Sequence, residues 1–292
     1  MKKKRKGFTL VELLVVIAII ALLMGILMPA LAKVRAIAFR VVCGTNLSGL
    51  GKAMLIYAND YEDEFPQAGY PTSTWVAGLT GWKGPTRVQA FGVPSSSKVT
   101  VASSLYLLVK YADVGPKQFL CKGTDTTEFK LSDWPATAGL DLIDVWDFGL
   151  RPVDYCSYSY HSAYNSPFAL TTAGSQPGMA LAADRNPWLD PAVDPKTLDF
   201  IWDGDTNQQK AGNAIAHGND GQNVLFLDGH VAFEKRAFCG VMSDNIYTFC
   251  ARTGAGPIEQ GTPPADGGDV PQHKEDSLLL NEGGAAPPPP PD

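Results

Sequence analysis

Three groups of residues in the sequence have the types and spacing that chemistry requires, and the first is rich in oxygen. Asp203, Asp205 and Asn207 alternate along the chain and offer carboxylate and amide oxygens, the ligands that Ca²⁺ prefers. Ala214 stands where a helix-loop-helix calcium site requires a glutamate, which excludes that motif. A calcium ion in an irregular loop is therefore a candidate cofactor. Acidic turn residues that bond their own backbone are the alternative explanation.

The second group is His217, Asp228 and His230, whose imidazole and carboxylate donors could form a transition-metal or hydrolase site. The sequence contains no G-x-S-x-G, H-E-x-x-H or C-x-x-C motif and no glycine-rich phosphate loop. We therefore expect that the protein is not an enzyme. A metal-dependent hydrolase centred on these three residues is the least favoured alternative.

The third candidate is Glu12, the single charge in the otherwise apolar residues 8–32. A run of about 20 apolar residues is long enough to cross a bilayer as a helix. Five cations at residues 2–6 precede it, and they predict that its start faces the cytoplasm. Because a carboxylate in such a segment costs on the order of 3 kcal/mol, we expect Glu12 to have a partner and a purpose.

Residues 6–12, KGFTLVE, resemble the processing site of type IV pilins and of the pseudopilins of type II secretion. The resemblance implies that prepilin peptidase cuts after Gly7 and that the new N-terminal residue, Phe8, is methylated. It also implies that Glu12 pairs with the amine of an adjoining subunit during assembly, and Pro29 matches a proline often found in pilin helices. A secretory signal ending at the small-x-small residues 30–32, or a plain signal anchor, is the alternative, but neither has a use for Glu12.

The elements that position these residues begin with one long helix. Apolar residues recur at three- and four-residue steps from Leu31 to Tyr61, which predicts that a transmembrane helix, 8–32, continues as an amphipathic helix, 33–64. Glycines at 44, 49 and 51 are expected to weaken its middle. Residues 43–66 resemble the end of the pseudopilin helix. We expect an α+β, pilin-like fold in which this helix packs on an antiparallel sheet with many loops.

The domain at 65–251 carries further local signals. Residues 222–234 predict a hairpin with Asp228-Gly229 as its two-residue turn, and residues 224–227 are apolar throughout, which predicts cover on both faces. With His217, the stretch resembles the signature of prepilin-like bacterial proteins named for a histidine, nine residues and Asp-Gly (H-X9-DG), although ten residues intervene here. Residues 103–111 predict a helix with a serine cap. The aromatic residues of 134–164 predict core packing, and a sugar-binding or partner surface is the less favoured alternative.

Composition limits the partners and the end of the chain. The net charge of −6 becomes about −11 once the leader, residues 1–7, is removed, which argues against nucleic-acid binding. If the domain is exported, the five cysteines allow one or two disulfides and leave at least one free thiol. Cys239 and Cys250 are close enough in sequence to close a short loop. Residues 252–292, rich in glycine and proline, predict a disordered tail.

These patterns predict a single-pass membrane protein whose domain lies outside the cytoplasm. The resemblance implies that the membrane is the bacterial inner membrane and that the domain lies in the periplasm or at the cell surface. The resemblance implies a structural pilin-like or pseudopilin subunit of a type IV pilus or a type II secretion filament. Its partners would be prepilin peptidase, other pilin-like subunits and the membrane. A membrane-tethered binding protein that uses the same export route is the alternative.

Overall fold

The computed structural model describes residues 9–161, 164, 168–250 and 257–283. Its strands form a five-stranded antiparallel sheet in the order β6-β5-β4-β3-β7 and a small parallel pair, β1-β2. The predicted α+β class is confirmed. The helices are α1 (Leu10–Asp60), α2 (Arg87–Phe91), α3 (Val101–Tyr111) and α4 (Thr206–Lys210), and the strands are β1 (Thr74–Trp75), β2 (Lys98–Val99), β3 (Tyr158–His161), β4 (Ala180–Asp184), β5 (Gln222–Phe226), β6 (Val231–Glu234) and β7 (Leu279–Leu280).

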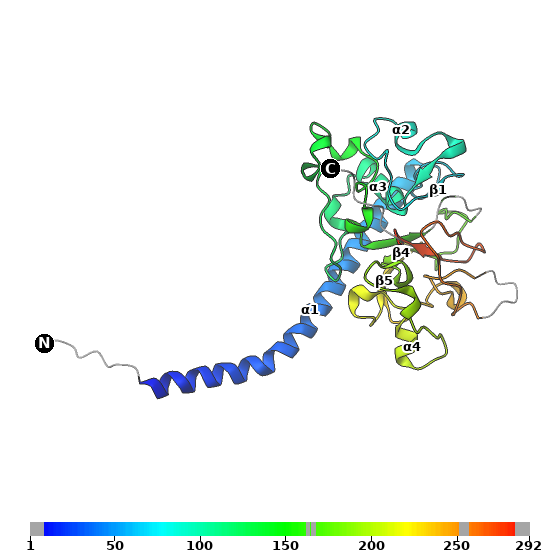
Figure 1. The fold of residues 1–292 in the computed structure, drawn as a ribbon. Helices are drawn as coiled ribbons and strands as arrows, with labels where there is room; N and C mark the ends of the chain where they lie inside the picture. The colour runs from blue at the N-terminus through cyan, green and yellow to red at the C-terminus, as the bar shows by residue number, and fades with distance from the viewer. Residues whose placement is uncertain (1–8, 162–163, 165–167, 251–256, 284–292) are drawn as a thin grey trace.

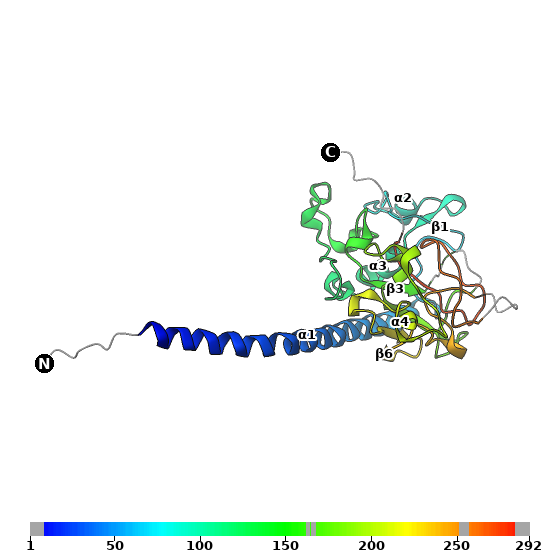
Figure 2. The same cartoon turned by 60° about the horizontal axis from the view of Figure 1, so that its bottom comes forward.

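Helix α1 is continuous over 51 residues, with Pro29 inside it. Its first half projects away from the body formed by the rest of the chain, as Figures 1 and 2 both show. Buried residues begin only at Cys43, and from there the helix lies against the sheet. The helix ends at Asp60 rather than at residue 64, because Glu62 and Asp63 take left-handed backbone angles, with φ of 52° and 65°.

The glycines of α1 have a different role from the one expected. A Cβ atom on Gly51 would lie 2.6 Å from Cδ1 of Leu225, and one on Gly44 would lie 3.0 Å from Oδ1 of Asn223. Both partners belong to β5. The missing side chains therefore let the helix approach the sheet closely, while the helix stays unbroken across them.

Strand β5, which lies between β6 and β4, is covered on both faces, as the sequence predicts. Leu225 packs in the main core, which also contains Leu47 and Leu50 of α1. Its neighbours Val224 and Phe226 face a second cluster, built from residues that include Trp188, Phe200 and Tyr247. Because successive side chains of a strand point to opposite faces, four consecutive apolar residues require two separate cores.

The predicted hairpin is confirmed, but its turn differs by one residue. The N–H of Phe226 bonds the carbonyl of His230 at 3.0 Å, and the N–H of Gly229 bonds the carbonyl of Phe226 at 2.9 Å. The loop therefore has three residues, 227–229, and Gly229 holds the left-handed position with φ of 86°. Gly229 correctly indicates a hairpin, because three-residue hairpin loops place a glycine in the left-handed position that follows the turn.

The aromatic residues of 134–164 pack in the main core, as predicted, and Phe148 is an example. Tyr106 of α3 meets Phe148 edge to face with 4.8 Å between ring centroids, and Phe148 meets Phe119 at 4.9 Å. Helix α3 begins earlier than expected, because the hydroxyl of Thr100 accepts the N–H of Ser103 at 2.9 Å. Thr100 is thus the cap, and Ser103 is its partner three residues into the helix.

The prediction of a disordered tail is wrong for residues 257–283. Strand β7 lies at the edge of the sheet, where Leu280 pairs with Tyr160 of β3. Leu278, Leu279 and Leu280 are fully buried. Three consecutive leucines are enough for an edge strand, even in a segment whose composition otherwise favours disorder.

Candidate functional site

The N-terminal end of α1 places an acid at the start of an uncovered apolar helix. The Glu12 carboxylate accepts hydrogen bonds from the Thr9 N–H at 2.8 Å and from the Thr9 hydroxyl at 2.6 Å, and the same hydroxyl accepts the Glu12 N–H at 3.2 Å. This reciprocal arrangement satisfies two backbone donors that the helix leaves unpaired. The predicted processing residues, Gly7 and Phe8, lie outside the described residues.

The first half of α1 is apolar and bare. Its most apolar 18-residue window has a mean hydropathy of 3.1, and none of that window is buried. Leu10 is 79% exposed and Ile26 is 69% exposed. In the part of the chain that the structure describes, α1 alone is long and apolar enough to cross a membrane. A continuous apolar surface of this kind requires a bilayer or other helices to cover it.

Comparison with known families decides the class of this N-terminal segment. Residues 2–28 match the family model of the prokaryotic N-terminal methylation motif. This motif supports a type IV pilin-like protein. Its motif implies processing by prepilin peptidase and assembly with other pilin subunits in general, and its apolar helix is compatible with a single-pass membrane anchor. Comparisons with curated proteins and with solved structures found no match.

The matched residues contain Gly7, Phe8 and Glu12, so the pilin-like motif includes all three. The match does not extend to His217 or Asp228, and the resemblance to the H-X9-DG signature stays a prediction from sequence. The structure also separates the residues of that signature. His217 is buried on a short 3-10 helix, whereas Asp228 lies in the exposed hairpin turn.

The proposed hydrolase residues do not meet in one site. The Nε2 atom of His217 lies 3.0 Å from a carboxylate oxygen of Asp184. His230 instead contacts Asp228, whose carboxylate accepts the His230 N–H at 3.0 Å as well as a bond with its ring. The backbone N–H of His230 is the main cause that lowers the pKa of Asp228. This second pair is a solvent-exposed turn contact.

The candidate calcium residues lie in an exposed turn that leads into α4. One carboxylate oxygen of Asp205 accepts the N–H groups of Asn207 at 2.8 Å and Gln208 at 3.0 Å. Asp205 therefore caps α4, as an acidic residue at a helix start commonly does. Asp203 and Asn207 are also exposed. The capping role accounts for Asp205 without a metal, and the calcium ion stays a prediction.

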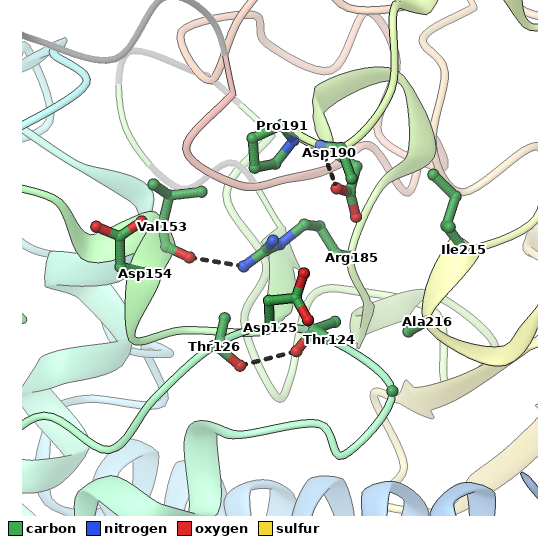
Figure 3. A pocket seen from close by; sticks show the side chains of 12 residues that line it. Thr124, Asp125, Thr126, Val153, Asp154, Arg185, Asp190, Pro191, Ile215 and Ala216 are labelled. Atoms are coloured by element: carbon green, nitrogen blue, oxygen red, sulfur yellow. Dashed lines mark hydrogen bonds between the residues drawn. The ribbon is translucent and has the colours of Figure 1, made fainter.

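A recess of about 430 Å³ lies between the loop after Cys121 and the 3-10 helix that ends at His217 (Figure 3). Arg185 reaches across it, and its guanidinium donates to the carbonyls of Val153 at 2.8 Å and Cys156 at 2.7 Å. Asp190 accepts the N–H of Ala192 at 2.9 Å. Arg185 and Asp190 thus bond to backbone groups around the recess, which indicates that they stabilise the surrounding loops.

The structure also assembles a cluster that sequence reasoning missed. Cys43 of α1, Cys121, Asp184 at the end of β4 and His217 are all buried, and their donor atoms lie within 4.8 Å of one another. The two Sγ atoms are 2.7 Å apart, and Sγ of Cys121 lies 3.8 Å from Nε2 of His217. All five cysteines are free, so the expected disulfides, including Cys239 with Cys250, do not form in this structure.

The electrostatics of the cluster follow from its contacts. Burial by itself lowers the pKa of His217, but the hydrogen bonds to Asp184 and Cys43 outweigh it and raise the pKa to about 9. The hydrogen bond with Cys121 lowers the pKa of Cys43 to about 6 against the opposing effect of burial. The same bond and burial raise the pKa of the Cys121 thiol. The ring of His217 and the carboxyl group of Asp184 thus face two sulfur atoms, and all four groups are buried.

Proposed function

We propose that this protein is a structural subunit that assembles with other pilin-like subunits through α1 into a filament of the type IV pilus or type II secretion class. The bare apolar half of α1, which carries the N-terminal methylation motif, supports this role. In the membrane, lipid covers that surface. In a filament, the same surface packs against the helices of neighbouring subunits, while the sheet domain stays outside and has no catalytic task.

The role proposed for Glu12 follows from its position and its bonds. Within residues 9–161 and the other described parts of the chain, the side chain of Glu12 is hydrogen-bonded only to Thr9, in its own helix cap. Cleavage after Gly7 creates an ammonium group at Phe8, and a neighbouring subunit can offer the same group to Glu12. Two opposite charges in a medium of low dielectric constant stabilise each other only when they are matched, so the pair sets the register between subunits.

The test changes the charge of Glu12 without removing its cap. Glu12→Gln keeps a side-chain oxygen that can accept the Thr9 N–H, because glutamine also serves in this capping arrangement. Thr9→Ala is the matched control, since it removes the cap and leaves the charge. The protein is followed in cells by mass spectrometry of the mature N-terminus and by electron microscopy of tagged filaments.

We expect both variants to be cut after Gly7 and methylated at Phe8, and only Glu12→Gln to be lost from filaments. Incorporation of Glu12→Gln at the wild-type level would remove the register role. An unprocessed chain that starts at Met1, or a chain cut near residue 32, would remove the filament proposal itself.

A further inference from the structure

Four polar side chains from four separate parts of the fold converge where α1 meets the sheet. Cys43 comes from α1, Cys121 from the loop after a 3-10 helix (Pro116–Phe119), Asp184 from the end of β4 and His217 from the 3-10 helix Ile215–His217. We propose that these four residues form a binding site for a thiophilic divalent cation of the zinc class, which ties α1 to the sheet domain. This proposal does not depend on filament assembly.

The donor set and its dimensions suit such an ion. Two thiolates, one imidazole and one carboxylate match the sulfur, nitrogen and oxygen ligands of tetrahedral zinc, whose bonds of about 2.0–2.3 Å place donor atoms roughly 3.3–3.8 Å apart. The Cys121–His217 separation of 3.8 Å lies in this range, whereas the His217–Asp184 separation of 3.0 Å is shorter and must widen slightly to admit the ion. The sulfur atoms, now 2.7 Å apart, must also separate by about 1 Å when the ion binds.

A second layer of contacts fixes the carboxylate. One oxygen of Asp184 accepts the backbone N–H of Asn223 at 2.7 Å and its side-chain amide at 3.0 Å. The other oxygen, Oδ1, is buried and has no hydrogen-bond partner among the described residues. An unpaired buried oxygen is costly, and a metal ion beside it would supply the missing interaction. Metal ligands are commonly oriented by such outer contacts.

The competing chemistry is a disulfide between Cys43 and Cys121. That bond would remove two electrons and two protons from the thiols, and it would leave the sulfur atoms without negative charge to bind a cation. It would use two of the four groups and leave the unpaired Asp184 oxygen unexplained. A bound cation uses all four groups, and its two positive charges offset two of the three negative charges on the thiolates and the carboxylate, which is why we favour the metal.

The experiment uses the full chain in detergent. The protein is isolated from membranes without reductant in the presence of a thiol-blocking reagent, and its peptides are mapped by mass spectrometry. A second sample is reduced, stripped with chelator and equilibrated with zinc chloride or with cobalt chloride. Elemental analysis gives the stoichiometry, and the cobalt spectrum reports thiolate ligands and tetrahedral geometry.

We expect one equivalent of metal per chain, cobalt bands of a tetrahedral thiolate site, and protection of Cys43 and Cys121 from alkylation when zinc is bound. Cys121→Ser should weaken binding more than tenfold, and Asn223→Ala should weaken it about 10–100-fold, as loss of an outer contact does. Cys239→Ser, which changes a cysteine outside the cluster, is the matched control and should bind normally.

Three outcomes would overturn the proposal. They are the absence of stoichiometric zinc on the wild-type chain, a Cys43–Cys121 disulfide as the main form isolated from membranes, and zinc binding that leaves both thiols open to alkylation. The alkylation map is read on the wild-type protein, so it decides the question even if the ligand variants fail to fold.

Discussion

Replacement of one buried acid should remove a pH dependence from the stability of the protein. Glu282 is fully enclosed at the start of α3, where its carboxylate accepts the N–H of Ala102 at 2.8 Å. Burial raises its pKa from 4.5 to about 7, although the backbone bonds partly oppose the rise. Burial also raises the pKa of Asp147, with the charge of Glu282 as the second cause.

The magnitude follows from the difference between the two pKa values of Glu282. A rise from 4.5 to about 7 corresponds to roughly 3 kcal/mol. Below pH 4.5 both the folded and the unfolded chain hold this proton, so stability is complete. As the pH rises, the unfolded chain releases the proton first and is favoured. The free energy of unfolding should therefore fall by up to about 3 kcal/mol between pH 4.5 and pH 7.

Glu282→Gln keeps the oxygen that accepts the Ala102 N–H but cannot ionise. We expect the variant to be more stable than the wild type at pH 7.5, by up to about 3 kcal/mol, and equal to it at pH 4.5. Urea unfolding in detergent, followed by tryptophan fluorescence, measures this, with the exposed Asp199→Asn as control. A variant that loses stability at pH 7.5, or keeps the wild-type slope, would refute the reasoning.

Two further substitutions test how the fold is held together, and the same urea assay measures both. Gly51→Val should destabilise the protein by about 1–3 kcal/mol, because the new side chain overlaps Leu225 in a filled core; unchanged or higher stability would mean that the helix does not approach the sheet so closely. Asn186→Ala should cost roughly 3 kcal/mol, because its amide donates to the carbonyls of Tyr247 and Leu279 at 2.9 Å each. A loss below 1 kcal/mol would show that water replaces those bonds.

The features predicted correctly from sequence are local ones. The long apolar run and its amphipathic continuation contain the whole signal for α1 within one segment. The hairpin around Asp228 and Gly229 is likewise determined by neighbouring residues. Only the position of the glycine in the turn differs, because two- and three-residue loops share the same composition.

The features that were missed depend on contacts between distant segments. Cys43 and Cys121 are 78 residues apart, and no short spacing marks them as partners. From the sequence, the glycines of α1 are expected to weaken the helix. Their actual role, which is to allow close contact with Leu225 and Asn223, depends on a strand far along the chain. The composition of the tail favours disorder, and the prediction failed because the pairing of β7 with β3 joins distant segments that no local sequence pattern can reveal.

The position of β7 has a consequence for how the domain is made. During synthesis, β3 emerges long before Leu279 and Leu280, so one of its edges stays open while the rest of the sheet forms. An unpaired edge can accept the equivalent strand of another copy, which is a common route to exchanged dimers and aggregates. A chain that stops short of Ser277 would keep that edge open permanently. Leu279 and Leu280 thus complete the sheet edge only at the end of synthesis. Until then, each new molecule can pair this edge with the wrong strand.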